Sequence, residues 1–298
     1  MKNKWLWISV GLVCVFVLVF MSCAVIALLF RDNDTKLVKG SGIGVVEVKG
    51  VILDSQETVK QLHDFGRDDD VKAVVLRVDS PGGVVGPSQE IYQEVKKLAK
   101  KKKVVVSMGS LAASGGYYIS APASLIYANP GSITGSIGVL MKFSNVEGLM
   151  DKIGMKAFTL KTGKYKDSGS PVRPMTAEEK ALLQGVIEST HGQFVKAVSE
   201  GRNLPVEQVK AIADGRIFSG EQALAARLVD RLGSMQDAIE EAGRLAGIKG
   251  EPEVIRPPKK KKLLLDMLVE ESASRISNLV REEIGMSVSY EMAGVGGK

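Results

Sequence analysis

The stretch that most constrains the fold runs from Lys103 to Ser120, where an apolar strand pattern leads into small residues. Val104-Val-Val106 is a run of β-branched residues, which is typical of a buried strand. Ala112-Ala-Ser114-Gly-Gly116 follows, and Tyr117-Tyr-Ile119 then predicts a short helix. A serine at a strand-to-helix turn is exposed and close to backbone N–H groups, as a nucleophile requires, although the G-x-S-x-G pattern is absent. A turn that needs small residues only for packing is the alternative.

Strand and helix patterns alternate through the central part of the chain. The predicted strands are residues 43–49, 71–79, 103–108, 125–128, 137–141 and 157–161. The predicted helices between them are 55–65, 87–101 and 145–154. This alternation indicates βαβ units, so we expect an α/β fold with a mostly parallel sheet.

Beyond Gly163 the pattern changes. A polar segment rich in Gly, Ser and Pro extends to Pro174 and is not expected to be helical. Thr176-Ala-Glu-Glu179 is a capping box, which predicts a long amphipathic helix reaching about Glu200. The remaining expectations are short helices at 205–214, 219–232 and 235–246, a linker at 251–258, an amphipathic helix at 263–284 and a loose tail at 287–298.

The N-terminal segment is apolar almost without interruption over residues 5–30, which is long enough to span a bilayer. Lys2 and Lys4 precede it, and the charges that follow it cancel. The positive-inside rule then places the N-terminus in the cytoplasm and the rest of the chain outside. We therefore predict a cytoplasmic N-terminus with one transmembrane helix in 1–34, a catalytic domain in 35–250, and a C-terminal part in 251–298.

Composition excludes several function classes. The chain has 40 basic and 34 acidic residues, but only 5% of its residues are aromatic and none interleave with the basic ones. A nucleic-acid surface is therefore not expected. Cys14 and Cys23 both lie in the apolar segment, so the rest of the chain has no thiolate nucleophile, disulfide or cysteine-based zinc site. His63 and His191 stand far apart and outside any metal-ligand spacing.

A serine nucleophile needs a base and N–H donors for the developing oxyanion. Neither histidine lies in a motif, which leaves Asp, Glu or a lysine whose pKa is lowered by desolvation. Residue type alone selects no single lysine. Asp79-Ser-Pro-Gly-Gly83 follows a predicted strand, and its paired glycines let a backbone N–H approach a ligand. A plain Pro-Gly turn is the alternative at that position.

Several motifs resemble the signal peptide peptidase A family, peptidase family S49 of the Clp-protease/crotonase superfamily. They are residues 79–84, 108–120, 130–139, 163–167 and 212–218. The resemblance spans about residues 43–245 and implies a fold of repeated Clp-protease/crotonase-like units. Its length matches the short form of the family, with one catalytic domain.

Carried over by motif, the resemblance implies a Ser/Lys dyad. It makes Ser114 the nucleophile, Lys166 the general base and Ser136 the residue that holds the lysine amine. The backbone N–H groups of Gly83 and Gly115 would form the oxyanion hole. No metal or cofactor is implied.

The resemblance also implies a ring-like homo-oligomer in which Lys166 reaches the serine of a neighbouring protomer. The implied substrates are cleaved signal peptides and other apolar peptides, and the implied location is the bacterial cytoplasmic membrane, with the peptidase domain on the extracytoplasmic side. Two alternatives stay open. A crotonase-type acyl-CoA enzyme would share the fold and a two-amide oxyanion hole, and a non-catalytic membrane scaffold would use the fold only for assembly.

Overall fold

The structure is a computed structural model that describes residues 16–17, 20–21, 41–258 and 289–291. The chain divides into residues 1–40 and 41–298, and the description below concerns the second unit. Most of the predicted span at 5–30, and all of the predicted helix at 263–284, lie outside the described residues. Within the described ranges, no helix combines the length and the apolar character that crossing a bilayer requires.

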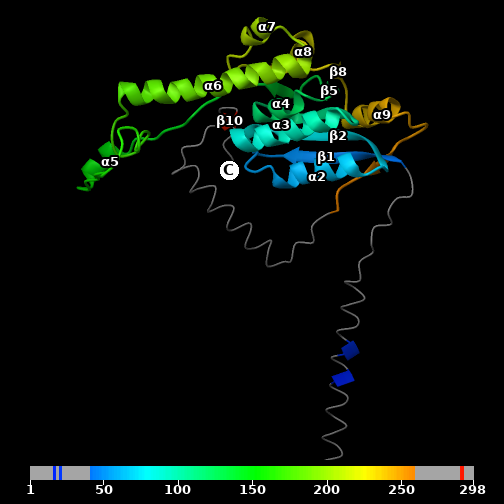
Figure 1. Cartoon of the computed structure of the whole chain (residues 1–298), viewed down its shortest axis with the longest axis horizontal. Helices are drawn as coiled ribbons and strands as arrows, with labels where there is room; N and C mark the ends of the chain where they lie inside the picture. The colour runs from blue at the N-terminus through cyan, green and yellow to red at the C-terminus, as the bar shows by residue number, and fades with distance from the viewer. Residues whose placement is uncertain (1–15, 18–19, 22–40, 259–288, 292–298) are drawn as a thin grey trace, which may run out of the picture. The chain divides into compact units, whose positions relative to one another are not determined.

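The centre of the molecule is a parallel sheet (Figure 1). Its order is β9 (Glu253–Ile255), β1 (Gly42–Lys49), β2 (Val71–Ser80) and β4 (Lys103–Ala113), with every neighbouring pair parallel. The β-branched residues that predicted buried strands lie in these central strands, where both faces of the sheet are covered. The expectation of a mixed α/β fold with a mostly parallel sheet is confirmed.

β4 has two successive neighbours along its length. Its first half pairs with β5 (Leu125–Ala128), which in turn pairs with β8 (Arg231–Leu232). Its second half pairs with β6 (Ile133–Gly135), which pairs antiparallel with β7 (Ile217–Ser219). The strand that ends at the predicted nucleophile is therefore held by β6 on one side and by β2 on the other.

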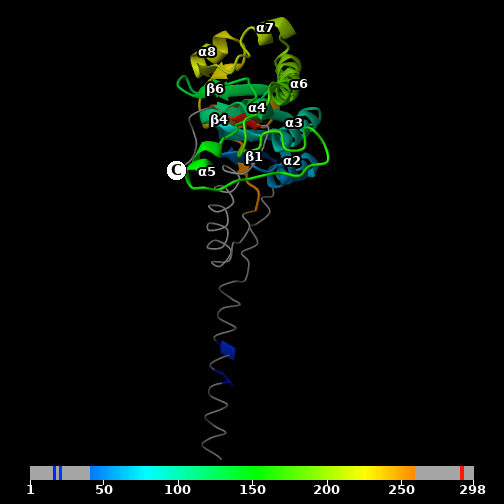
Figure 2. The ribbon, with the colours of Figure 1, turned by 90° about the vertical axis from the view of Figure 1, so that its left-hand side faces the viewer.

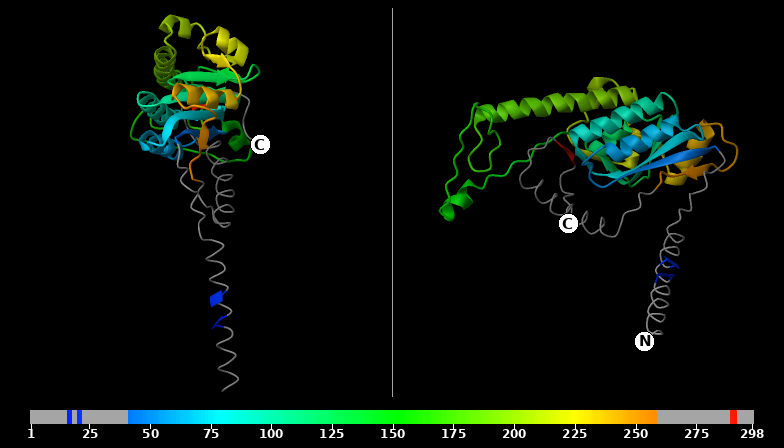
Figure 3. Two further views of the ribbon diagram at one scale, coloured as in Figure 1. Left: turned by 90° about the vertical axis from the view of Figure 1, so that its right-hand side faces the viewer. Right: turned by 60° about the horizontal axis from the view of Figure 1, so that its bottom comes forward.

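Side chains alternate between the two faces of the sheet and build two cores. The larger core lies beneath α2 (Gln56–Arg67), α3 (Val85–Ala99), α4 (Gly115–Ser120) and α6 (Ala177–Arg202). The smaller core contains Ile43, Val45 and Val75 and is covered by α9 (Met235–Leu245), the orange helix of Figure 3. The other helices are α5 (Glu147–Lys152), α7 (Val206–Lys210) and α8 (Gly220–Ala225).

The long helix α6 packs its apolar side chains into the core only at its C-terminal end. Its buried apolar residues, Phe194, Val195, Ala197 and Val198, all lie in its C-terminal half. At its N-terminus, the Thr176 hydroxyl accepts from the Glu179 N–H and the Glu179 carboxylate accepts from the Thr176 N–H, so the predicted capping box is confirmed. Figure 1 shows the helix running past the end of α3, with the segment that contains α5 beyond it, and Figure 2 looks along the helix from the side of α5.

Some sequence expectations were wrong. Residues 157–161 form no strand and are all exposed, because no described strand lies beside them to complete a ladder. Residues 137–141 are irregular apart from one bridge position at Leu140. Residues 219–232 divide into α8 and β8 instead of forming one helix. Short strands occupy positions that were expected to be a linker or a tail, namely β9 and β10 (Ser289–Glu291).

Candidate active site

Ser114 stands at the junction of β4 and α4 in a strained backbone conformation. Its φ is 55° and its ψ is −117°, a combination that L-residues rarely adopt. Backbone bonds on both sides hold it, because its N–H donates to the Gly135 carbonyl at 2.8 Å and its own carbonyl accepts from the Tyr118 N–H at 2.8 Å. Strain of this kind persists where the surroundings over-determine it, and it is concentrated at functional sites.

Ser114 was expected to be exposed at its turn, but the structure buries it completely between β4 and α4. Its Oγ atom has no hydrogen-bond partner among the described residues. All six residues of α4 are buried as well. Buried hydroxyls are normally paired, because leaving one unpaired costs free energy. A hydroxyl without an internal partner can instead receive a base and attack a substrate.

Two glycines lie beside Ser114. Gly83 is the middle residue of β3 (Gly82–Val84), which is bonded to Ile52 by two backbone hydrogen bonds of 2.8 Å. A Cβ atom placed on Gly115 would lie 3.1 Å from the Gly83 nitrogen, so the two glycines are adjacent. A Cβ atom on Gly83 would lie 2.1 Å from the Ile52 carbonyl oxygen. The approach of these backbones therefore requires glycine at position 83, and the fold brings Gly83 and Gly115 to Ser114.

Ser136 occupies the position in register with Ser114 on the neighbouring strand. Ala113 pairs with Gly135, so each serine directly follows a paired residue. Ser136 also has a positive φ, of 50°, and its N–H donates to the Arg216 carbonyl at 2.8 Å. It is buried. Four of the five predicted site residues are thus gathered where β2, β4 and β6 end, at the carboxyl edge of the sheet.

Lys166 is the exception. It lies in a series of turns, where its N–H donates to the Gly163 carbonyl at 3.2 Å, and its side chain is exposed. Because Ser114 Oγ has no partner in the described part of the chain, Lys166 does not contact it within one protomer. A single copy of the fold brings the predicted nucleophile and the predicted oxyanion glycines together but not the predicted base.

An ion-pair cluster beside Lys166 was not predicted. The Arg173 guanidinium donates to both carboxylate oxygens of Asp167, at 3.0 and 2.8 Å, and to both of Glu179, at 2.9 and 2.5 Å. Arg173 also holds the pKa of Glu179 at about 2, and Arg173 and then Lys161 lower the pKa of Asp167. The only sequence signal is two six-residue intervals, and residues six apart do not contact each other in either a helix or a strand. Among the described residues, no group of three or more His, Cys, Asp or Glu is arranged to hold a metal ion.

β3 pairs with an additional strand next to Gly83. Residues Ser289–Glu291 form β10 and pair antiparallel with β3, with Tyr290 opposite Gly83. An extended backbone can therefore add to this edge by main-chain pairing, as peptides do in β-augmentation.

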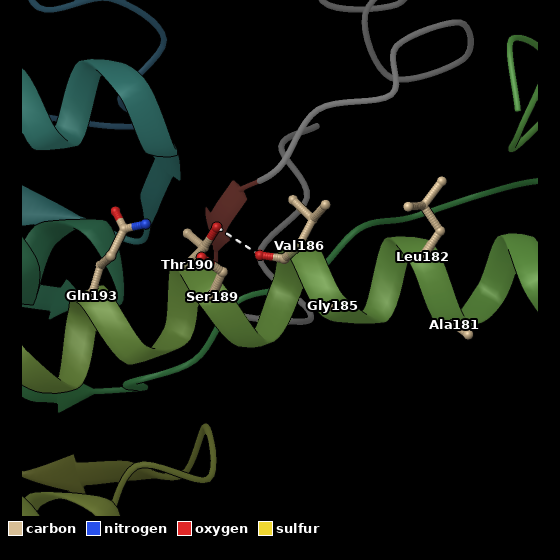
Figure 4. A pocket seen from close by; sticks show the side chains of 7 residues that line it. All are labelled: Ala181, Leu182, Gly185, Val186, Ser189, Thr190 and Gln193. Carbon is tan, nitrogen blue, oxygen red and sulfur yellow. Dashed lines mark hydrogen bonds between the residues drawn. The ribbon is translucent and has the colours of Figure 1, made fainter.

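A shallow groove lies on the outer part of α6 (Figure 4). The Thr190 hydroxyl donates to the Val186 carbonyl at 2.9 Å along its floor. The groove includes none of the predicted site residues. It is lined by Ala181, Leu182, Gly185, Val186, Ser189, Thr190 and Gln193.

Comparison with known proteins gives consistent matches. The model of peptidase family S49 matches residues 96–249, and the Clp protease model matches residues 46–128. The chain is 46% identical over 221 residues to slr0021 of Synechocystis, which is named as a protease, covering 73% of this chain and 80% of that one. It is 48% identical over 202 residues to MJ0651 of Methanocaldococcus jannaschii, also named as a protease, covering 68% of this chain and 65% of that one.

A third relative has a more specific name. An Enterococcus faecium protein named as a signal peptide peptidase SppA is 34% identical over 275 residues, and the match covers 80% of each chain.

Proposed function

Because the chain belongs to peptidase family S49, a family of serine proteases, we propose that it is a membrane-anchored endopeptidase with a Ser114–Lys166 dyad that degrades signal peptides and other apolar peptides. The observation that carries this proposal is the strained, buried Ser114, which lies beside two glycines and whose Oγ has no partner among the residues that the structure describes.

Ser114 attacks the scissile carbonyl carbon in this mechanism. The oxyanion that forms is bound by the N–H groups of Gly83 and Gly115, which come from two different elements and are already adjacent. The Ser114 proton passes to the neutral amine of Lys166, which Ser136 orients. The resulting ammonium gives that proton to the leaving amine, and the same dyad then activates the water that hydrolyses the acyl-enzyme.

A second copy of the chain supplies Lys166. The outer half of α6, from Thr190 back to Ala177, extends about 20 Å beyond the last buried turn, and the lysine segment is attached at its far end. Large apolar side chains are exposed on that segment, with Phe158 at 86% and Leu160 at 92%. Their burial against a neighbouring protomer would stabilise an oligomer and bring Lys166 to the neighbour's Ser114.

The substrate binds as an extended strand on β3. The pairing of β10 with β3 supports this, since it places a peptide backbone opposite Gly83. The apolar residues 5–30 would tether the site to the cytoplasmic membrane, with the peptidase domain on the extracytoplasmic side. Apolar peptides released in that bilayer are therefore the substrate class that the anchor favours.

The test uses the full chain in detergent and an apolar fluorogenic peptide. Ser114→Ala and Lys166→Ala should each lose at least about 10⁴-fold in kcat/KM, whereas Lys164→Ala, a matched exposed lysine on the same segment, should stay within twofold of wild type. A serine-reactive phosphonate should label Ser114, as read by intact and peptide mass spectrometry.

Two results would overturn the proposal. Full activity of Ser114→Ala would rule out Ser114 as the nucleophile. The peptidase mechanism would be ruled out if the wild-type protein assembles but neither cleaves the peptide nor takes the label. In the second case binding of acyl-CoA would be measured next, because a crotonase-type enzyme shares the two-amide oxyanion hole.

A further inference from the structure

The segment that carries Lys166 has almost no core of its own. Residues 151–166 are all exposed, and α5 has no buried residue. Ser168 is the first buried residue after Lys166, and its hydroxyl donates to the Glu179 carboxylate at 3.3 Å. Hydrophobic packing within residues 41–258 therefore does not set the position of the lysine.

Arg173 connects the two sides of this segment. Its side chain lies between Asp167, the residue after Lys166, and Glu179, in the first turn of α6. Besides the four bonds to carboxylate oxygens, Arg173 Nη2 donates to the Asp167 backbone carbonyl at 3.1 Å. The guanidinium thus fixes the main chain one residue from Lys166, and not only a neighbouring side chain.

The connection continues to the core. Glu179 is only 3% exposed at its side chain and is fixed a second time by the Thr176 capping box. α6 then runs without interruption to Phe194 and Val198, which are fully buried. A continuous path of strong contacts joins Lys166 to the hydrophobic core through Arg173 and α6.

We propose that Arg173 is a positioning residue for the general base, holding the Lys166 turn on the end of α6 so that the lysine amine meets the serine of the next protomer. This inference rests on the proposed function. Only arginine offers two parallel donor pairs to two carboxylates at once, since lysine presents a single point charge.

The main expected effect is on catalysis. A displacement of about 1 Å at a reacting group costs about 100-fold in rate, so Arg173→Met should lower kcat about 100-fold while KM stays within twofold. Arg173→Lys, which keeps a cation between the carboxylates, should lose about tenfold. The melting temperature should fall, because the nearly buried Glu179 carboxylate loses its guanidinium partner, but the chain should still fold, because the buried end of α6 is untouched.

Mixed oligomers give the sharpest test. Two differently tagged chains are co-expressed and purified through both tags, one with Ser114→Ala and the other with Lys166→Ala, so that the first supplies lysines and the second supplies serines. This mixture should regain activity. Adding Arg173→Met to the lysine-supplying chain should remove about 100-fold of the regained rate. Adding it to the serine-supplying chain should leave the rate within twofold.

Two controls match Arg173. Arg244→Met breaks another arginine–glutamate pair with two hydrogen bonds, to the buried Glu241 on α9. Its kcat should stay within twofold of wild type. Lys164→Met breaks the exposed pair with Glu178, which joins the same turn to the same helix. It should also stay within twofold, because an exposed pair contributes little.

The outcomes separate the two proposals. Equal losses from Arg173→Met on either chain would show a general structural role and overturn the positioning role. If Ser114→Ala or Lys166→Ala alone cleaves like wild type, the proposed function fails, and the role of Arg173 fails with it. If both are inactive alone but Arg173→Met retains full kcat, only the role of Arg173 fails. If Arg173→Met does not assemble, the same comparison is made with Arg173→Lys, and equal losses on either chain would overturn the proposal in the same way.

Discussion

All residues from Gly115 to Ser120, next to Ser114, are buried, whereas all residues from 151 to 166, which lead to Lys166, are exposed. Ser114 is held by backbone hydrogen bonds, a parallel sheet and the larger core. The lysine turn is held by charges at the end of a helix. The comparison teaches that the core of one chain fixes the proposed nucleophile, whereas the proposed base lies on an exposed segment that does not contact that serine within the same chain.

The largest effect in this comparison is expected for Gly83, which lies beside Ser114, in contrast to Gly163, which lies on the segment of Lys166. Gly83→Ala places a methyl group 2.1 Å from the Ile52 carbonyl oxygen, so β3 must move and its N–H leaves the proposed oxyanion hole. We expect kcat/KM to fall by about 10³-fold or more, as for loss of an oxyanion donor. The Cβ atom added by Gly163→Ala meets no atom within 4 Å, so kcat/KM should stay within twofold of wild type. Equal kcat/KM values for the two variants, measured with the fluorogenic peptide, would contradict the assignment of Gly83.

The next comparison concerns stability. Phe194 is fully buried, and its ring lies edge-on to Tyr118 with 4.9 Å between centroids. Phe194→Ala should lower the free energy of unfolding by about 3–5 kcal/mol. Leu160→Ala, at a side chain that is 92% exposed, should change it by less than about 0.5 kcal/mol. Thermal and urea denaturation measure both, and a large loss for Leu160→Ala in the dissociated chain would show that the lysine segment does have a core of its own.

A smaller effect is expected on assembly. Phe158→Ser combined with Leu160→Ser removes two exposed apolar side chains, each of which contributes about 1.5–3 kcal/mol if it is buried in an interface. We expect the protein concentration at half-maximal specific activity to rise by at least tenfold, with full activity regained at high concentration. Sedimentation velocity would follow the oligomer directly. If neither the activity nor the oligomer depends on these residues, another surface joins the protomers.

The smallest effect is the response of the lysine turn to pH. Pairing with Arg173 lowers the pKa values of Asp167 and Glu179, to about 2 for Glu179. Their contribution is therefore complete above the ordinary carboxyl pKa of about 4 and is lost as the pH falls through the lowered values. Hydrogen exchange of residues 161–176, corrected for intrinsic rates, should show unchanged protection from pH 7 to pH 5 and loss of protection near pH 2. Loss of protection already at pH 5 would mean that the carboxylates are not paired in solution.

Much of the site was predictable because its signals are local. The β-branched run before Ser114, the small residues after it and the capping box at Thr176 each act over a few residues, and the structure follows all three. The irregular course of residues 164–174 follows from its Gly, Ser and Pro content in the same way. The positive φ of Ser114 and Ser136 has no such signal, since it depends on paired strands that end together.

Pattern alone determined the α/β class, the central strands β1, β2 and β4 with the helices between them, and the serine at the strand-to-helix turn, because burial and backbone preference depend on neighbouring residues. Tertiary structure decided the rest. β9 pairs with β1 and β10 with β3 across most of the chain length, and such short strands exist only through distant partners. The Arg173 cluster likewise joins residues six positions apart, which neither a helix nor a strand brings into contact. Hydrogen bonds and ion pairs between distant residues require the folded chain to bring them together, so their positions are not encoded in any local run of sequence.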